Sequence, residues 1–292
     1  MRRRTGRIAI VVMGLWTAAS SMRARAEERP ILVGPLARAE LRKPPYGDWF
    51  EAQYSRYQPS APILESLRPL LADVTIEAYF GTWCGDSRRQ IPRLMRLLDL
   101  ESFDEQRLSL VGLSDRAQEF KRSPGNLEAK REVHRTPTIV FLREGVEIGR
   151  IVETPASSLE ADLLAILEGH GPEPKYGAEA WVHHLFTALP SAQAIKALQS
   201  GGAEVRKRGD PGSLWHYAEQ DLLKNGRALE AKAVLDLYLE LKPESAAGHV
   251  LLSEALIALG RRGEALAALE RALAIEPGND RARRAAAKLR EP

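Results

Sequence analysis

The sequence predicts an α/β domain followed by an all-helical repeat domain. In residues 61–170, segments with helical periodicity alternate with short β-branched runs, which is the layered pattern of an α/β fold. In residues 212–292, identical residues recur 34 positions apart: Leu222 and Leu256, Ala231 and Ala265, Leu235 and Leu269, Pro243 and Pro277. The 292 residues are enough for about two domains of about 150 residues each.

The composition excludes several classes of protein. With 44% hydrophobic and 28% charged residues, the chain is neither wholly disordered nor fibrous. Its formal charge is +3, but residues 1–26 hold six arginines and no acid, and the rest has 36 basic and 39 acidic residues. A net charge of −3 gives no reason to expect a nucleic-acid partner. The single cysteine, Cys84, excludes an intrachain disulfide and a multi-cysteine zinc site.

Residues 1–26 have the three parts of a secretory signal peptide. Arginines precede an apolar run over residues 8–19, and Ala24-Arg25-Ala26 forms a cleavage site before Glu27. The apolar run is too short to span a bilayer, which needs about 20 residues, and no later stretch forms a stable transmembrane segment. We therefore expect export, to a bacterial periplasm, with cleavage after Ala26. The alternative is an uncleaved anchor.

Residues 27–60 are expected to form an N-terminal extension, interrupted at Pro44-Pro45, with one aromatic-rich helix over residues 49–57. The α/β domain over residues 61–170 follows. Its expected elements are a helix over 62–71, a strand over 74–80, a helix over 84–100 broken at Pro92, a strand over 107–113, a short helix over 127–133, strands over 138–141 and 146–152, and a helix over 157–168.

Residues 171–211 are interpreted as a linker with a possible degenerate helical hairpin, because Trp181 lies 34 residues before Trp215. A 34-residue period with helix–turn–helix patterning is the signature of the tetratricopeptide repeat. Residues 212–292 therefore predict two such repeats and a C-terminal capping helix, with Trp215 as a packing residue. The concave face of this module is the expected surface for a protein or peptide partner.

The sequence Trp83-Cys84-Gly85-Asp86-Ser87 follows a predicted buried strand and opens a helix. A cysteine at a helix N-terminus faces free backbone N–H groups and the positive end of the helix dipole, which favour thiolate over thiol. Arg88 adds positive charge, Asp86 opposes it, and the Ser87 hydroxyl is a candidate hydrogen-bond donor to the sulfur. These residues predict a reactive cysteine.

Residues farther along the chain also occur at the spacings of a known family. Pro92 lies eight residues after Cys84, Thr136-Pro137 precedes a strand, and Gly145 lies eight residues after Pro137. Residues 61–170 thereby resemble the thioredoxin superfamily, and more narrowly exported thioredoxin-like proteins with a W-C-G-D-S motif and a tetratricopeptide tail. The resemblance implies a thioredoxin-like fold and a cis peptide bond before Pro137. It also implies that backbone groups beside this bond pair with an extended bound chain.

By this resemblance the candidate site has two groups of residues. The candidate catalytic residues are Cys84, Ser87 and Pro137. The candidate substrate-binding residues are Trp83, Gly85, Asp86, Arg88 and Thr136. We expect neither a metal ion nor a cofactor.

Two departures from the family restrict the expected chemistry. Ser87 replaces the second cysteine of the family's C-x-x-C pair, and Ala78 stands where the family has a buried acid. Cys84 is therefore expected to form mixed disulfides with protein thiols or disulfides, which an external thiol must release. The alternative is a redox-inactive adaptor or scaffold that only binds partners.

One glutamate and three histidines are further candidates for a role near the site. Glu77 should face the opposite side of its strand from Ala78, where we expect an ion pair with an arginine. His134, close to Pro137, either approaches the site or is a solvated loop residue. His183 and His184 are adjacent and point about 100° apart on a helix, so they do not predict a metal site.

Overall fold

The computed structural model describes residues 30–117, 119–172 and 175–291. The predicted signal peptide and its cleavage site lie outside the described residues. The first part of the chain contains β1 (Gly34–Leu36), the 3₁₀ helix η1 (Arg38–Arg42), α1 (Gly47–Arg56), α2 (Ala61–Leu70), β2 (Val74–Phe80), α3 (Gly85–Leu100), η2 (Glu105–Arg107), β3 (Leu108–Gly112), η3 (Leu127–Arg131), β4 (Thr138–Arg143), β5 (Val146–Val152) and α4 (Leu159–Leu167).

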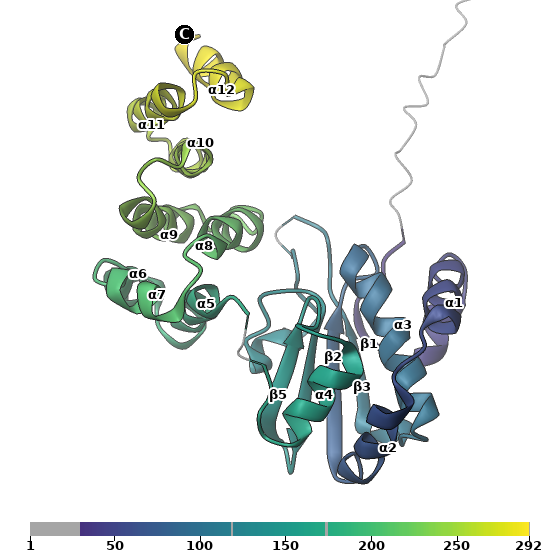
Figure 1. Cartoon of the computed structure of the whole chain (residues 1–292). Helices are drawn as coiled ribbons and strands as arrows, with labels where there is room; N and C mark the ends of the chain where they lie inside the picture. Colours follow the sequence, from purple (N-terminus) through teal and green to yellow (C-terminus); the bar gives the residue numbers. More distant parts are fainter. Residues whose placement is uncertain (1–29, 118, 173–174, 292) are drawn as a thin grey trace, which may run out of the picture. The chain divides into compact units, whose positions relative to one another are not determined.

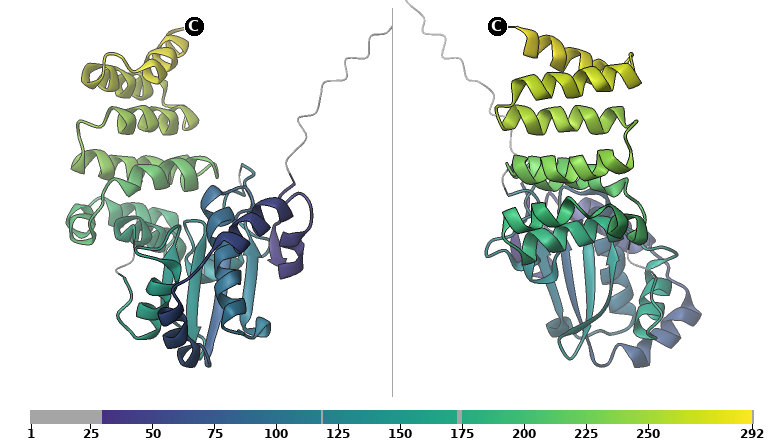
Figure 2. Two further views of the ribbon diagram at one scale, coloured as in Figure 1. Left: turned by 45° about the vertical axis from the view of Figure 1, so that its right-hand side comes forward. Right: turned by 90° about the vertical axis from the view of Figure 1, so that its left-hand side faces the viewer.

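The second part is helical. It contains α5 (Gly177–Ala188), α6 (Ser191–Leu198), α7 (Gly202–Arg208), α8 (Ser213–Tyr217), the π-helix η4 (Ala218–Leu223), α9 (Ala228–Leu241), α10 (Ala246–Ala258), α11 (Arg262–Ile275) and α12 (Asp280–Arg290). Figure 2 shows α9 to α12 stacked one on the next, as expected for helical repeats.

The strands form one mixed sheet in the order β1-β3-β2-β4-β5 (Figure 1). β2 and β3 are parallel, whereas the pairs β1–β3, β2–β4 and β4–β5 are antiparallel. In the central strand, Ala78 is in register with Leu110 of β3 and Ile139 of β4. This mixed sheet is compatible with the expected thioredoxin-like fold.

The two faces of the sheet are covered by different parts of the chain. Ile76, Ala78 and Phe80 alternate along β2 and belong to the large hydrophobic cluster that α1, α2, α3 and α4 share. Tyr79 belongs to a smaller cluster on the opposite face, together with Val133 from the β3–β4 connection. The long connection between β3 and β4 therefore covers the face that the four helices leave open.

The N-terminal segment is part of the α/β core rather than a separate extension. Leu41 of η1 and Phe50 of α1 are fully buried in the same cluster as the sheet residues. β1, a strand that was not predicted, pairs with β3 and forms one edge of the sheet. The α/β core therefore begins well before residue 61, where we had expected it.

Two predicted helices differ in form. The expected break at Pro92 is wrong, because α3 continues from Gly85 to Leu100. A proline removes one helical hydrogen bond, but Ile91 and Leu94 beside it are fully buried and hold the helix on the sheet. The short helix expected over 127–133 is the 3₁₀ helix η3.

Residues 175–211 contain three helices, α5, α6 and α7, where we expected a linker and at most one hairpin. Their apolar residues share one cluster with α8, η4 and α9. Trp215 is only partly buried, whereas Leu214 and Tyr217 are fully buried. The first helix of the repeat, α8, contacts α5 as well as α9, and Trp215 packs against the shared cluster, as predicted.

Candidate functional site: the Cys84 thiol and its surroundings

Cys84 lies between the central strand and the helix that follows it. It occupies the position before α3, with extended backbone angles (φ −85°, ψ 129°). Its N–H donates to Gly81 O at 2.9 Å, and its carbonyl accepts from Arg88 N at 3.0 Å. The side chain is partly exposed and is not in a disulfide. This position gives the sulfur both access to solvent and proximity to the helix N-terminus.

The loop before β4 reaches the sulfur. The Cys84 thiol donates to Thr136 O at 3.3 Å, and the peptide bond between Thr136 and Pro137 is cis. Ser87 is 1% exposed, and its Oγ accepts from Gly81 N at 3.2 Å and lies 3.5 Å from Thr136 Oγ1. The expected donation from Ser87 to the sulfur is not among the hydrogen bonds of the described residues. The structure thus brings together Cys84, Ser87, Thr136 and Pro137.

The polar side chains around the thiol mainly bind groups other than the sulfur. Trp83 Nε1 donates to Leu113 O at 2.8 Å, and Asp86 pairs with Arg89 at 2.6 Å. Arg88 Nε donates to Thr82 O at 2.6 Å, and the same guanidinium lies 5.9 Å from the Trp49 ring centroid. The surroundings of the Cys84 sulfur are therefore set mainly by the backbone of α3 and of Thr136, and not by a positively charged side chain next to the sulfur.

Gly85 needs no glycine-specific backbone or space. A Cβ added there would meet no atom within 4 Å. The remaining role for Gly85 is that, without a side chain, it leaves the surface beside Cys84 uncovered for a bound substrate.

Glu77 forms the expected ion pair. Arg131 Nε and Nη2 donate to its carboxylate at 2.8 and 2.9 Å, and the Tyr79 hydroxyl donates at 2.8 Å. The hydrogen bond from Arg131 holds the pKa of Glu77 below its usual value. The carboxylate is thus fixed on the sheet face opposite Ala78, and it is a structural partner of Arg131.

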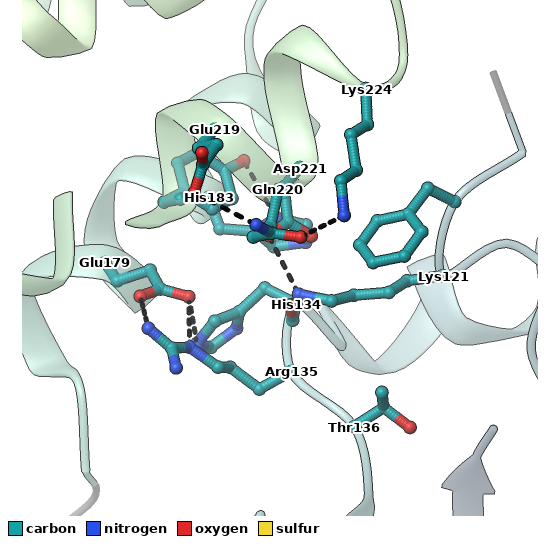
Figure 3. Close-up of polar contacts among 12 residues, drawn as sticks. Lys121, His134, Arg135, Thr136, Glu179, His183, Glu219, Gln220, Asp221 and Lys224 are labelled. Atoms are coloured by element: carbon teal, nitrogen blue, oxygen red, sulfur yellow. Dashed lines mark hydrogen bonds and ion pairs between the residues drawn. The ribbon is translucent and has the colours of Figure 1, made fainter. Parts of the chain in front are cut away.

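A buried polar cluster that no sequence motif predicted lies next to this loop (Figure 3). Arg135 donates to Glu179 of α5 through Nε at 2.7 Å and Nη2 at 2.5 Å. Lys121 Nζ donates to Asp221 of η4 at 2.9 Å. Charged residues in loops and on helix surfaces usually remain solvated, so only the closeness of Arg135 to Pro137 could have drawn attention to this cluster.

His134 belongs to the same cluster, and the interpretation of it as a solvated loop residue is wrong. It is 5% exposed, and its ring lies 5.3 Å from that of His183. His183 is also buried and lies 3.0 Å from the Tyr217 hydroxyl through Nδ1. His184, next to it, is exposed and pairs with Glu132, so the two adjacent histidines do point apart. No cluster of metal-ligating side chains occurs in the described part of the chain.

The family model of the tetratricopeptide repeat matches residues 222–289. Residues 222–289 form a tetratricopeptide repeat region. This region includes α9, α10, α11 and most of α12, and it indicates a protein-binding role. Comparisons with curated proteins and with solved structures gave no match.

The tetratricopeptide region and the other described elements contain no helix that is both long and apolar enough to cross a bilayer.

Burial changes the proton affinities in the polar cluster. It raises the pKa of Glu179 to about 7, and the guanidinium of Arg135 limits this rise. It lowers the pKa of His134 to about 3 and also lowers that of His183. At neutral pH the neighbouring side chains of His134 and His183 are therefore uncharged.

Replacing His134 with glutamine should make stability less sensitive to acid. In the folded protein His134 has a pKa of about 3, against about 6.5 for a solvated histidine, so the unfolded chain binds more protons below pH 6.5. The histidine therefore costs stability as the pH falls from 7 to 5, by about 2 kcal/mol. Urea unfolding at both pH values should show the variant gaining this amount relative to wild type. The exposed His184→Gln should gain much less, and an equal gain for both variants would contradict the burial of His134.

Proposed function

We propose that this chain is an exported thioredoxin-like protein that forms mixed disulfides through Cys84. Its tetratricopeptide region would bind a protein partner. One observation carries the redox part: the partly exposed Cys84 thiol precedes α3 and lies 3.3 Å from Thr136 O, next to cis Pro137. The order of the mixed sheet supports the thioredoxin-like part. The signal-like residues 1–26 support export to a periplasm, with Glu27 as the mature N-terminus.

The chemistry follows from a single sulfur. The Cys84 thiolate attacks one sulfur of a substrate disulfide, forms a new S–S bond, and releases the other substrate sulfur as a thiolate. No second cysteine exists in the chain to break the new bond. An external thiol must therefore attack the mixed disulfide and release Cys84. The proposed contacts for the bound substrate are Trp83, Gly85, Asp86, Arg88 and Thr136.

The wild-type protein should accumulate a stable adduct with glutathione disulfide. Because the chain has one cysteine, intact-mass spectrometry assigns any adduct to Cys84. The adduct should persist after the free disulfide is removed and disappear when dithiothreitol is added. Ser87→Cys should instead release glutathione without added thiol, because it restores a resolving thiol one helical turn from Cys84.

Cys84→Ser is the control and should give no adduct. A wild-type protein that gives no adduct at neutral pH with excess disulfide would contradict the redox proposal. It would leave the second candidate function, a redox-inactive adaptor that binds partners. Two contacts favour that alternative: the Cys84 thiol donates a hydrogen bond to Thr136 O, and Arg88 Nε donates to Thr82 O instead of to the sulfur.

A further inference from the structure

The loop that reaches Cys84 is fastened to helices outside the α/β domain. Thr136, whose carbonyl accepts from the Cys84 thiol, directly follows His134 and Arg135. Both of these residues are buried. Their contacts therefore determine where the Thr136 carbonyl lies relative to the sulfur.

Arg135 connects this loop to α5. Its guanidinium makes two parallel hydrogen bonds with the carboxylate of Glu179, which has no exposed side-chain surface. Arg135 Nη1 also donates to Glu153 at 3.1 Å, within the α/β domain. A bidentate pair of this kind fixes the orientation of the guanidinium plane as well as its distance.

Lys121 makes a second connection, to η4. Its Nζ donates to Asp221 Oδ2 at 2.9 Å and to the backbone carbonyl of His134 at 2.8 Å (Figure 3). The adjacent Phe120 is held in the same way, because its N–H donates to Asn225 Oδ1 at 3.0 Å. The Phe120 ring in turn lies 5.2 Å from the ring of Trp83, beside Cys84. Two neighbours of the thiol, Thr136 and Trp83, are therefore connected to the helical part through Lys121 and Phe120.

We infer that Glu179 and Asp221 are positioning residues for the Cys84 thiol. They act through Arg135 and Lys121, which hold the backbone of residues 134–136 so that Thr136 O meets the sulfur. The helical part thereby completes the site instead of being only a separate partner-binding module. This inference rests on the proposed role of Cys84, but it concerns the placement of the thiol and not its reaction with disulfides.

The test is the rate at which iodoacetamide alkylates Cys84 in the full-length chain between pH 6 and 9. In Glu179→Ala, the freed loop should no longer keep Thr136 O as acceptor for the thiol, so the thiolate becomes more populated. The rate at neutral pH should rise about fivefold, which corresponds to one net hydrogen bond, and the pH–rate profile should move to lower pH. Asp221→Asn should shift the profile in the same direction by less, because it keeps an acceptor for Lys121.

Three comparisons separate positioning from general destabilisation. Asp236→Ala, which breaks an exposed pair with Lys232 on α9, should leave the profile unchanged. In an Arg135→Ala background, adding Glu179→Ala should have no further effect, because Glu179 acts through Arg135. Glu179→Gln keeps the shape of the side chain and should shift the pH–rate profile by an intermediate amount. It replaces Glu179→Ala in the test if that variant does not fold.

A folded Glu179→Ala or Glu179→Gln variant with a wild-type profile would overturn the inference, even with reduced stability. This result is distinguishable from failure of the proposed function. Without any glutathione adduct in wild type, the redox proposal fails, but alkylation still decides whether the helical part positions the thiol.

Discussion

Replacing Arg135 with alanine should lower the free energy of unfolding by about 3 to 5 kcal/mol, the range for breaking a buried ion pair. The change leaves the Glu179 carboxylate, which has no exposed side-chain surface, without its two hydrogen bonds. It also removes the guanidinium that lies 3.9 Å from the Tyr176 ring centroid. Urea unfolding at pH 7, followed by circular dichroism, measures the loss.

Two variants test the cause of this loss. Lys232→Ala breaks an exposed pair and should cost less than about 0.5 kcal/mol. Replacing both Arg135 and Glu179 with methionine should recover most of the stability, because no buried carboxyl group then remains without its hydrogen bonds. A loss of under about 1 kcal/mol for Arg135→Ala would mean that the pair is hydrated in solution.

Replacing Phe50 with alanine should cost about 3 to 5 kcal/mol, the range for a large core aromatic side chain. Phe50 is fully buried, its ring stacks on Tyr54 at 5.9 Å, and the Arg42 guanidinium lies 5.0 Å from its ring centroid. The cost tests whether the segment before residue 61 is part of the α/β core. Thermal and urea unfolding of the full-length chain measure it.

Leu229→Ala is the matched control for Phe50→Ala. Leu229 is 53% exposed, so its truncation should change stability by less than about 0.5 kcal/mol. Equal, small effects of the two changes would show that α1 contributes little to the α/β core and that residues 27–60 are an N-terminal extension, as the sequence predicted.

Strands that carry strong local signals could be predicted from the sequence. β2 and β5 have the predicted bounds, because each is a β-branched run between turn residues. β1 could not be predicted, because Gly34–Leu36 carries no strand pattern and depends on pairing with β3. The tetratricopeptide repeats were evident because identical residues recur at a fixed period, a signal that does not depend on tertiary contacts.

The site was predictable where it depends on local sequence and not where it depends on distant contacts. The motif around Cys84 predicted its position before α3, and the structure places Thr136 and Pro137 beside Ser87 and Cys84. The partners of Arg135 could not be predicted. Glu179 lies 44 residues away, in the first turn of α5, where a glutamate is ordinarily solvated. Its burial follows from packing that no local pattern encodes.

The division of charge between the two parts of the chain limits how the protein can evolve. The cations Arg135 and Lys121 lie in the β3–β4 connection, whereas the carboxylates Glu179 and Asp221 lie on α5 and η4. A recombination event that joined this α/β domain to helices from another protein would leave Lys121 without Asp221 and Arg135 with Glu153 as its remaining carboxylate partner, at a cost of several kcal/mol. The α/β domain and its first helices therefore have to be inherited together, whereas repeats beyond α9 can be gained or lost without disturbing either ion pair.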